Sequence, residues 1–215
     1  VPLAGLVYAP RQAADIFAQG INLAHAGMDQ RKAHIIAREV ALKLKTSPLM
    51  NKNKSYKPVA LHHHLLKGLN KPSTWPPSEN NREELSEAKM SKSIPGSAIF
   101  VDDSEETIRK NLANAFCPPD YPEHNPLLDW VSHLVFAREK SSLKIEREKR
   151  FGGDVEYFTY VDLLKDYQSH TLHPADLKNG MADYLLRLLA PIRTAIKKPA
   201  IAKLKSEFEQ LRVTR

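Results

Sequence analysis

A short run of lysines and serines is the part of this sequence with the most direct chemical use. Lys89, Met90, Ser91, Lys92 and Ser93 follow one another at the end of a long polar stretch. Ammonium groups and hydroxyls on a loop can follow negative charge as it moves onto a leaving pyrophosphate. The run therefore suggests a phosphate-handling site, although five residues alone leave a charged surface loop open as the alternative.

Three polar residues near the start of the chain have a spacing that would place them on one side of a helix. Tyr8, Gln12 and Asp15 are separated by four and three residues, which places them on one face if the segment is helical. A helix start with polar residues at the surface would give the same pattern. The spacing alone therefore does not distinguish a ligand pocket from a solvated helix.

A third group of residues occupies two segments of the second half of the chain. Phe151 begins a Phe-Gly-Gly-Asp run, and His173, Asp176 and Lys178 follow within His-Pro-Ala-Asp-Leu-Lys. An aromatic ring can stack on an unpaired base while a carboxylate accepts from a base edge, which is how proteins read single-stranded RNA. The structural alternative is a glycine turn and a helix start with Pro174 in its first turn.

Helices and a strand must position the residues of the first half. Hydrophobic periodicity predicts a helix over residues 12–23 and a second one over residues 33–44. A strand is expected at residues 58–61, and a long polar loop at residues 68–88. Helix, helix, strand and loop in this order are typical of the end of an α/β domain.

Helical patterns dominate the second half. We expect a helix over residues 105–115 behind an Asp-Asp-Ser cap, and apolar stripes over residues 127–135 and 177–196. Pro199 should break the last of these helices. Residues 138–150 carry mixed charge and are expected to be a solvated surface segment.

Composition narrows the class of protein. The chain has 215 residues, a formal net charge of +7 and a pI near 9.4, which suggests a polyanionic partner. Cys117 is the single cysteine, so a disulfide framework is excluded and a cytoplasmic setting is expected. No apolar run is long enough to span a membrane, and the first residues lack the features of a signal peptide. Since they also lack an initiator methionine, we expect the chain to begin partway through a domain.

The lysine run and its surroundings resemble a known family. Lys-Met-Ser-Lys-Ser is the second signature of class I aminoacyl-tRNA synthetases, and the sequences on both sides are similar to archaeal and eukaryotic tyrosyl-tRNA synthetases. The resemblance covers nearly the whole chain. It implies an α/β part followed by an all-α part, namely the C-terminal portion of a Rossmann-like catalytic domain at residues 1–103 and a helical anticodon-binding domain at residues 104–215.

The resemblance also implies roles for individual residues. Lys89 and Lys92 would be electrostatic catalysts of tyrosine activation, with Ser91 and Ser93 as phosphate donors. The residues expected at ATP are Met90, Lys92 and Gly27. The residues expected at tyrosine are Tyr8, Gln12, Asp15 and Gln30. The residues expected at the tRNA anticodon are Phe151, His173, Asp176 and Lys178.

The implied activity is that of a tyrosine–tRNA ligase, with L-tyrosine, ATP accompanied by Mg²⁺, and tRNA(Tyr) as its ligands. A homodimer is expected for the full-length enzyme. The His-x-Gly-His signature of the class is missing, so we expect a fragment or one half of a split synthetase, with anticodon binding retained and tyrosine activation negligible. The alternatives are a tryptophanyl-tRNA synthetase and a non-catalytic tRNA-binding module.

No metal site is expected. Three consecutive histidines, His62, His63 and His64, could suggest one, but adjacent residues of a strand point to opposite faces. Solvated imidazoles at a strand end are the interpretation that we favour.

Overall fold

The computed structural model describes residues 3–72, 74–75, 90–91 and 93–211. Backbone contacts divide the chain into two compact units, residues 1–65 and residues 66–215. The predicted domain boundary between residues 103 and 104 lies inside the second unit and stays a prediction.

The first unit combines two helices with a pair of parallel strands. Its elements are α1 (Leu3–Ala18), β1 (Leu23–Gly27), the short helix η1 (Met28–Gln30), α2 (Arg31–Val40), β2 (Met50–Asn51), β3 (Lys54–Ser55) and β4 (Val59–His63). Strands β1 and β4 run parallel, with a register from Leu23 opposite Val59 to Gly27 opposite His63. Strands β2 and β3 form a small antiparallel hairpin. Parallel pairing joined through a helix agrees with the α/β expectation for this region.

The helix predicted at residues 12–23 is placed wrongly at both ends. Helix α1 begins at Leu3 and continues through Pro10, which removes only one backbone hydrogen bond. It ends at Ala18, before Gly20 adopts a left-handed φ of 65°. Strand β1 follows from Leu23 and was not predicted. The second helix and the strand at residues 58–61 are confirmed as α2 and β4, although α2 ends at Val40.

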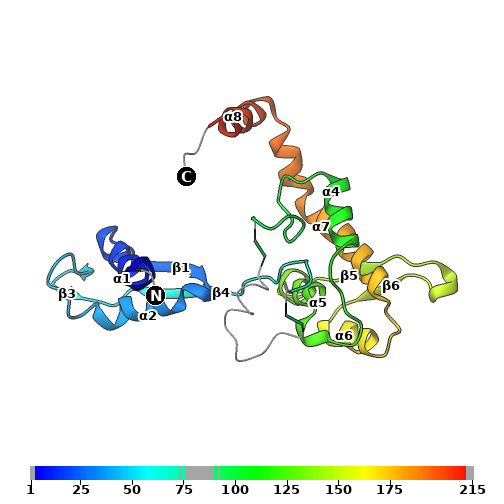
Figure 1. The fold of residues 1–215 in the computed structure, drawn as a ribbon, viewed down its shortest axis with the longest axis horizontal. Helices are drawn as coiled ribbons and strands as arrows, with labels where there is room; N and C mark the ends of the chain where they lie inside the picture. Colours follow the sequence, from blue (N-terminus) through cyan, green and yellow to red (C-terminus); the bar gives the residue numbers. More distant parts are fainter. Residues whose placement is uncertain (1–2, 73, 76–89, 92, 212–215) are drawn as a thin grey trace. The chain divides into compact units, whose positions relative to one another are not determined.

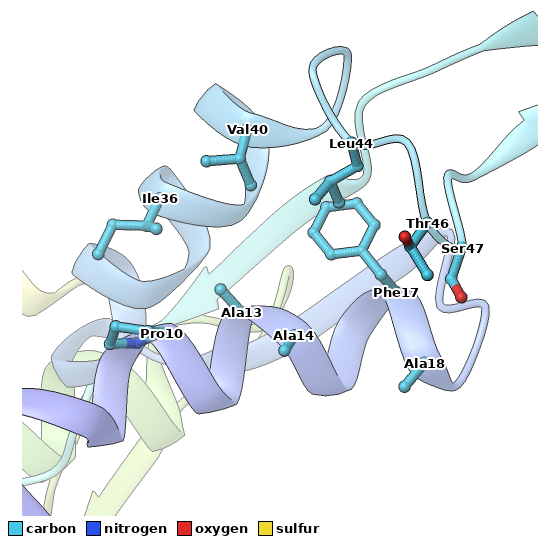
Figure 2. A pocket seen from close by; sticks show the side chains of 10 residues that line it. All are labelled: Pro10, Ala13, Ala14, Phe17, Ala18, Ile36, Val40, Leu44, Thr46 and Ser47. Carbon is cyan, nitrogen blue, oxygen red and sulfur yellow. The ribbon is translucent and has the colours of Figure 1, made fainter.

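The core of the first unit lies between α1, α2 and the strands. Its buried residues are Ala13, Ile16, Phe17, Ala24, Ala37, Ala41 and Leu49. An apolar hollow of about 390 Å³ opens between α1 and α2, and Figure 2 shows the Phe17 ring reaching from α1 toward Leu44.

The second unit is mainly helical. Its elements are α4 (Glu105–Ala113), η2 (Pro122–His124), α5 (Pro126–Trp130), the π-helical η3 (Val131–Val135), β5 (Leu143–Ile145), η4 (Lys149–Phe151), β6 (Val155–Tyr157), α6 (Tyr160–Gln168), α7 (Pro174–Ile196) and α8 (Pro199–Glu209). The long helix α7 packs against both α4 and β5, as Figure 1 shows. Gly180 permits the contact with β5, because an added Cβ would come within 2.6 Å of Ile145 Cγ1.

Several sequence predictions for this unit are confirmed. Ser104 caps α4 by accepting a hydrogen bond from the Thr107 amide. The stripe over residues 177–196 belongs to α7, which ends before Pro199, and Pro199 stands in the first turn of α8.

The all-α expectation is wrong in one respect. Strands β5 and β6 pair antiparallel, from Leu143 opposite Tyr157 to Ile145 opposite Val155. Residues 138–150 were expected to be solvated, yet Leu143 and Ile145 are fully buried. Charged residues occupy the alternate positions of this strand, so the high overall charge of the segment hid its apolar face.

The main core of the molecule belongs to this unit. Its largest buried side chains are Trp130 and Tyr167, and the Tyr167 hydroxyl donates a hydrogen bond to the Pro118 carbonyl at 3.0 Å. Among the described residues, no helix has both the length and the apolar character needed to cross a membrane.

Candidate functional site

The polar face of α1 contains a buried oxygen atom without a partner. Tyr8, Gln12 and Asp15 all lie in α1, so the structure confirms the helix that places them on one face. Tyr8 and Asp15 are exposed, and Gln12 is half-buried. The Gln12 Oε1 atom is shielded from solvent and accepts no hydrogen bond from any described residue. An unpaired buried oxygen of this kind costs about 1–3 kcal/mol, so a donor from outside the described residues would stabilise it.

The apolar hollow lies on a different side of α1. It is lined by Ala13, Ala14 and Phe17 of this helix, together with apolar residues of α2. Successive residues of a helix are rotated by about 100° around its axis. The residues of α1 that line the hollow therefore point, on average, more than a quarter turn away from Tyr8, Gln12 and Asp15. The hollow in Figure 2 is therefore separate from the predicted tyrosine-binding face.

Gly27 and Gln30 lie at the carboxyl end of β1. Gly27 is buried, and a Cβ added there would come within 2.6 Å of Leu65 Cδ2 and 2.8 Å of Asp29 Oδ1. A side chain at this position would have to displace the ends of the Leu65 and Asp29 side chains, so packing inside the unit favours glycine here. The predicted contact of Gly27 with ATP stays a prediction. Gln30 is half-buried at the start of α2, and its side chain makes no cap hydrogen bond. Carboxyl ends of parallel strands are where α/β folds bind ligands.

The structure describes part of the lysine and serine run. Lys89 and Lys92 lie outside the described residues. The Met90 amide donates to the Leu66 carbonyl at 3.0 Å, and its side chain packs against the main core. The Ser93 amide donates to Ser91 Oγ at 3.3 Å. Ser91 Oγ therefore acts as an acceptor in this turn.

Ser97 holds this turn, and it was not among the residues predicted from the sequence. Ser97 is 2% exposed, and its hydroxyl lies 2.7 Å from the Ser91 carbonyl and 2.8 Å from the Ile94 carbonyl. The Ser91 amide in turn donates to Ser97 Oγ at 3.3 Å. A serine directly after Pro95 and Gly96 was the available signal, because hydroxyls commonly close turns onto nearby backbone.

Phe151 stands at the tip of the β5–β6 hairpin with 58% of its surface exposed. The Arg150 guanidinium lies 4.7 Å from the center of its ring, within the range of a cation–π contact. Gly152 and Gly153 have φ values of 97° and 73°, a left-handed conformation that strongly favours glycine. The Phe-Gly-Gly run is thus a tight turn that presents an aromatic surface.

Asp154 closes this turn. Its carboxylate accepts a hydrogen bond from the Arg147 amide at 3.1 Å and pairs with Lys144 at 3.4 Å. These contacts, the amide first, lower the pKa of Asp154 below its ordinary value. Asp154 therefore stays ionised at neutral pH, with one oxygen committed to the backbone.

The His-Pro-Ala-Asp segment forms the start of α7. His173 is the N-cap, and its Nδ1 atom accepts a hydrogen bond from the Ala175 amide at 3.1 Å. Asp176 lies half-buried in the first turn, near the positive end of the helix dipole. The Lys178 ammonium donates to the Ala113 carbonyl at the end of α4 at 3.0 Å, so one of its donors is used within the protein. The anticodon roles of these residues stay predictions.

The histidines of β4 pair with histidines of other elements. His62 Nε2 lies 3.0 Å from His34 Nδ1 of α2, and His63 Nδ1 lies 3.0 Å from His25 Nε2 of β1. His62 and His63 therefore have different partners. His62 is half-buried, so the expectation of a solvated imidazole is wrong for it, whereas His63 and His64 are exposed as expected. Burial, followed by the nearby His62, lowers the pKa of His34 below 6.5.

Comparison with known proteins identifies the family. The family model of class I tRNA synthetases for tryptophan and tyrosine matches residues 1–190. The tyrosine–tRNA ligase of Thermococcus sibiricus is 50% identical over 200 residues, which are 92% of this chain and 53% of that protein. The chain thus spans about half the length of the curated relatives it matches.

Solved structures agree. The tyrosyl-tRNA synthetase of Pyrococcus horikoshii, solved with L-tyrosine, matches with a TM-score of 0.83 and 48% identity over 96% of this chain and 57% of that one. The tyrosyl-tRNA synthetase of Aeropyrum pernix matches with a TM-score of 0.74 and 35% identity over 98% of this chain and 55% of that one. The chain has the fold of a class I catalytic domain, with mixed helices and a small sheet. It therefore belongs to the class I tRNA synthetases of the tryptophan and tyrosine type, and its resemblance to the archaeal tyrosyl enzymes is confirmed.

Proposed function

We propose that this chain is part of a tyrosine–tRNA ligase, which activates L-tyrosine with ATP and transfers it to tRNA(Tyr). The observation that carries this proposal is the buried Gln12 Oε1 atom, which has no partner among the described residues and lies on the face of α1 that also bears Tyr8 and Asp15. The ammonium group of an amino acid is the donor that this oxygen lacks. A related synthetase with 48% identity was solved with L-tyrosine, which supports the choice of ligand.

Asp15 would select tyrosine. It lies three residues from Gln12, about 4.5 Å farther along the helix axis, so the two side chains can address different ends of one amino acid. In this proposal Tyr8, Gln12 and Gln30 hold the amino end, and the Asp15 carboxylate accepts a hydrogen bond from the phenolic hydroxyl. Phenylalanine would leave that carboxylate unpaired, which disfavours it.

The activation step needs charge stabilisation at ATP. The tyrosine carboxylate attacks the α-phosphate, and pyrophosphate leaves. Lys89 and Lys92 would stabilise the negative charge on the pyrophosphate, while Ser91 and Ser93 donate hydrogen bonds to phosphate oxygens. Met90 and Gly27 would border the nucleotide. Ser97 fixes the backbone of Ser91, so the hydroxyl donors start from a defined turn.

Mg²⁺ would accompany ATP. It would neutralise phosphate charge during the reaction. The residues proposed at ATP offer hydroxyls, ammonium groups and backbone, and they include no carboxylate. This set fits an ion held by the phosphates of ATP, because magnesium in proteins usually keeps several waters and few protein ligands.

The second unit would supply tRNA recognition. Phe151, His173 and Asp176 would contact the first anticodon base, with Lys178 at the RNA backbone, as parts of a mainly helical anticodon-binding domain over residues 104–215. The formal charge of +7 suits such a partner. A homodimer of the full-length enzyme and a cytoplasmic location complete the proposal.

Tyrosine-dependent exchange of pyrophosphate into ATP tests this function. We would measure it for the chain alone and together with the complementary segment of a related synthetase. Exchange should appear in the combined sample, and Asp15→Asn should lower the preference for tyrosine over phenylalanine about 10- to 100-fold, because a charged acceptor is lost. Glu39→Gln is the matched control, since Glu39 is an exposed carboxylate of α2.

Either alternative would be visible in the same assay. Specific tRNA binding with no exchange in any combination would indicate a non-catalytic module. Exchange that responds to tryptophan rather than tyrosine would overturn the assignment of the substrate.

A further inference from the structure

One arginine links the two segments that carry the proposed anticodon residues. Phe151 lies in the turn of the β5–β6 hairpin, whereas His173 and Asp176 begin α7. The Arg147 side chain donates from Nε to the Gly153 carbonyl at 2.9 Å and from Nη1 to the Thr171 carbonyl at 3.2 Å. A single guanidinium thus hydrogen-bonds both to the turn and to the segment directly before α7.

The hairpin is fixed at the same residue from its backbone side. The Arg147 amide donates to Asp154 Oδ1 at 3.1 Å, across the base of the turn. Inside the turn, the Glu148 carbonyl accepts from the amides of Phe151 and Gly153 at 2.9 and 3.2 Å. These local hydrogen bonds therefore fix the conformation of the turn. The side chain of Arg147 is free to fix the distance between the turn and α7.

The other end of this link is equally well defined. Thr171 precedes Leu172, which is 1% exposed and whose amide donates to the Asp166 carbonyl at 3.0 Å. His173 then caps α7 directly. Because Thr171 is two residues from His173 and is held by this buried neighbour, a hydrogen bond to its carbonyl acts on the start of the helix.

Arginine suits this geometry better than lysine. The guanidinium is planar and presents several N–H groups in a fixed fork, so it can reach two carbonyls in different directions at once. A lysine ammonium is a single compact group on a flexible stem. It would not bind both the Gly153 and the Thr171 carbonyl, which lie 18 residues apart in the chain, in the same fixed geometry. Arg147 is also half-buried, and its hydrogen bond to the Gly153 carbonyl is partly shielded from water.

We propose that Arg147 is a positioning residue for anticodon recognition: it holds Phe151 at a fixed distance from His173 and Asp176, so that one nucleotide can contact all three. This inference rests on the proposed function. In this role Arg147 acts through other residues. Its loss should therefore reduce the discrimination between anticodons more than it reduces the overall affinity for RNA.

The test compares tRNA(Tyr) with a tRNA(Tyr) that carries a changed first anticodon base. Binding of both would be measured at two salt concentrations for the wild-type chain, for Arg147→Lys and for Arg138→Lys. The affinity ratio of the two tRNAs should fall about tenfold in Arg147→Lys, which keeps the charge and loses the fork. It should stay unchanged in Arg138→Lys, because Arg138 is an exposed arginine that precedes β5. Thermal unfolding would verify that the variants fold.

The outcomes separate two kinds of failure. An equal loss of affinity for both tRNAs in Arg147→Lys would mean that this residue acts only as a charge, and would overturn the inference. A wild-type chain that binds both tRNAs equally would instead show that the proposed anticodon reading is wrong. Amide hydrogen exchange gives a readout without RNA: residues 151–153 and 173–177 should exchange faster together in Arg147→Lys, and unchanged exchange in both segments would also overturn it.

Discussion

The two candidate sites satisfy their polar groups in opposite ways. At the hairpin and the start of α7, the chain pairs its own groups: His173 accepts from an amide, Lys178 donates to a carbonyl, and Arg147 donates to two. On the polar face of α1, Gln12 Oε1 is buried and accepts no hydrogen bond within the described part of the chain. The first site is thus prearranged by the protein, while the second is complete only with a donor from elsewhere.

The cores beneath the two sites differ as well. Four of the seven buried residues in the core of the first unit are alanines. The second unit instead buries Trp130 and Tyr167 with many leucines. Larger side chains remove more apolar surface from water, at about 25 cal/mol per Å². We therefore expect the second unit to be the more stable one and the first to lose its structure more easily.

The largest effect on this comparison should come from Gly180. Gly180→Ala places a Cβ 2.6 Å from Ile145 Cγ1, and either the Ile145 side chain or the backbone of α7 or β5 must shift to relieve the contact. The free energy of unfolding of the second unit should fall by about 1–3 kcal/mol, as for other overpacked cores. Chemical denaturation followed by tryptophan fluorescence measures it selectively, because Trp75 and Trp130 both belong to that unit.

A double variant serves as the control for this contact. Ile145→Ala is destabilising alone because it leaves a cavity. Combined with Gly180→Ala it should destabilise less than the sum of the single changes, since the added methyl group then has room. Strict additivity would show that the close contact is not what requires glycine here.

A smaller effect, of opposite sign, is expected on the face of α1. Gln12→Leu removes a buried oxygen that no residue in the described part of the chain pairs, so the free energy of unfolding of the first unit should stay unchanged or rise by up to about 1 kcal/mol. At the same time the stabilisation of this unit by added L-tyrosine should disappear. Thermal unfolding with and without the amino acid measures both quantities.

Gln19→Leu is the matched change at an exposed position just after α1. It should leave the response to L-tyrosine intact. A clear loss of stability in Gln12→Leu would mean that the Gln12 amide is hydrogen-bonded in solution, and the contrast between the two sites would lose its main support.

Local patterns predicted the parts of the fold that depend on local chemistry. Capping and periodicity predicted the Asp-Asp-Ser cap at Ser104 and the presence of helix α2, and the structure agrees. Pro199 likewise marks the end of α7 and the start of α8. Tyr8, Gln12 and Asp15 were predicted to share a face on the condition that the segment is helical, and α1 meets that condition although the predicted helix began only at residue 12. The unpaired state of Gln12 Oε1 was not predicted, because it depends on which neighbours bury it.

Short strands and long-range contacts escaped prediction. Strand β1 has the sequence Leu-Ala-His-Ala-Gly, without β-branched residues, and becomes a strand through its pairing with β4. The hairpin β5–β6 was hidden by its charged alternate positions. Arg147 joins carbonyls 18 residues apart in sequence, and His34 meets His62 across 28 residues, so no local pattern reports either contact.

The smallest predicted effect is a difference between the two units in the pH dependence of their stability, and it involves His34. His34 is 4% exposed, and burial followed by the neighbouring His62 lowers its pKa below 6.5. As the pH falls through about 6.5, the unfolded chain takes up a proton that the folded unit resists, so the first unit loses stability toward acid and gains nothing above neutral pH. Its thermal transition, followed by amide hydrogen exchange of residues in the first unit, should move to lower temperature between pH 7.5 and about 5.5.

His34→Gln should remove most of this pH dependence, because the group that resists protonation is gone. The matched change His170→Gln concerns an exposed histidine of the second unit and should leave the dependence in place. Tryptophan fluorescence, which reports the second unit, should show a smaller shift than the first unit does. If acid lowered both transitions equally and His34→Gln changed neither, the titration of His34 would not distinguish the units. The contrast in stability between the units would then rest on their cores alone.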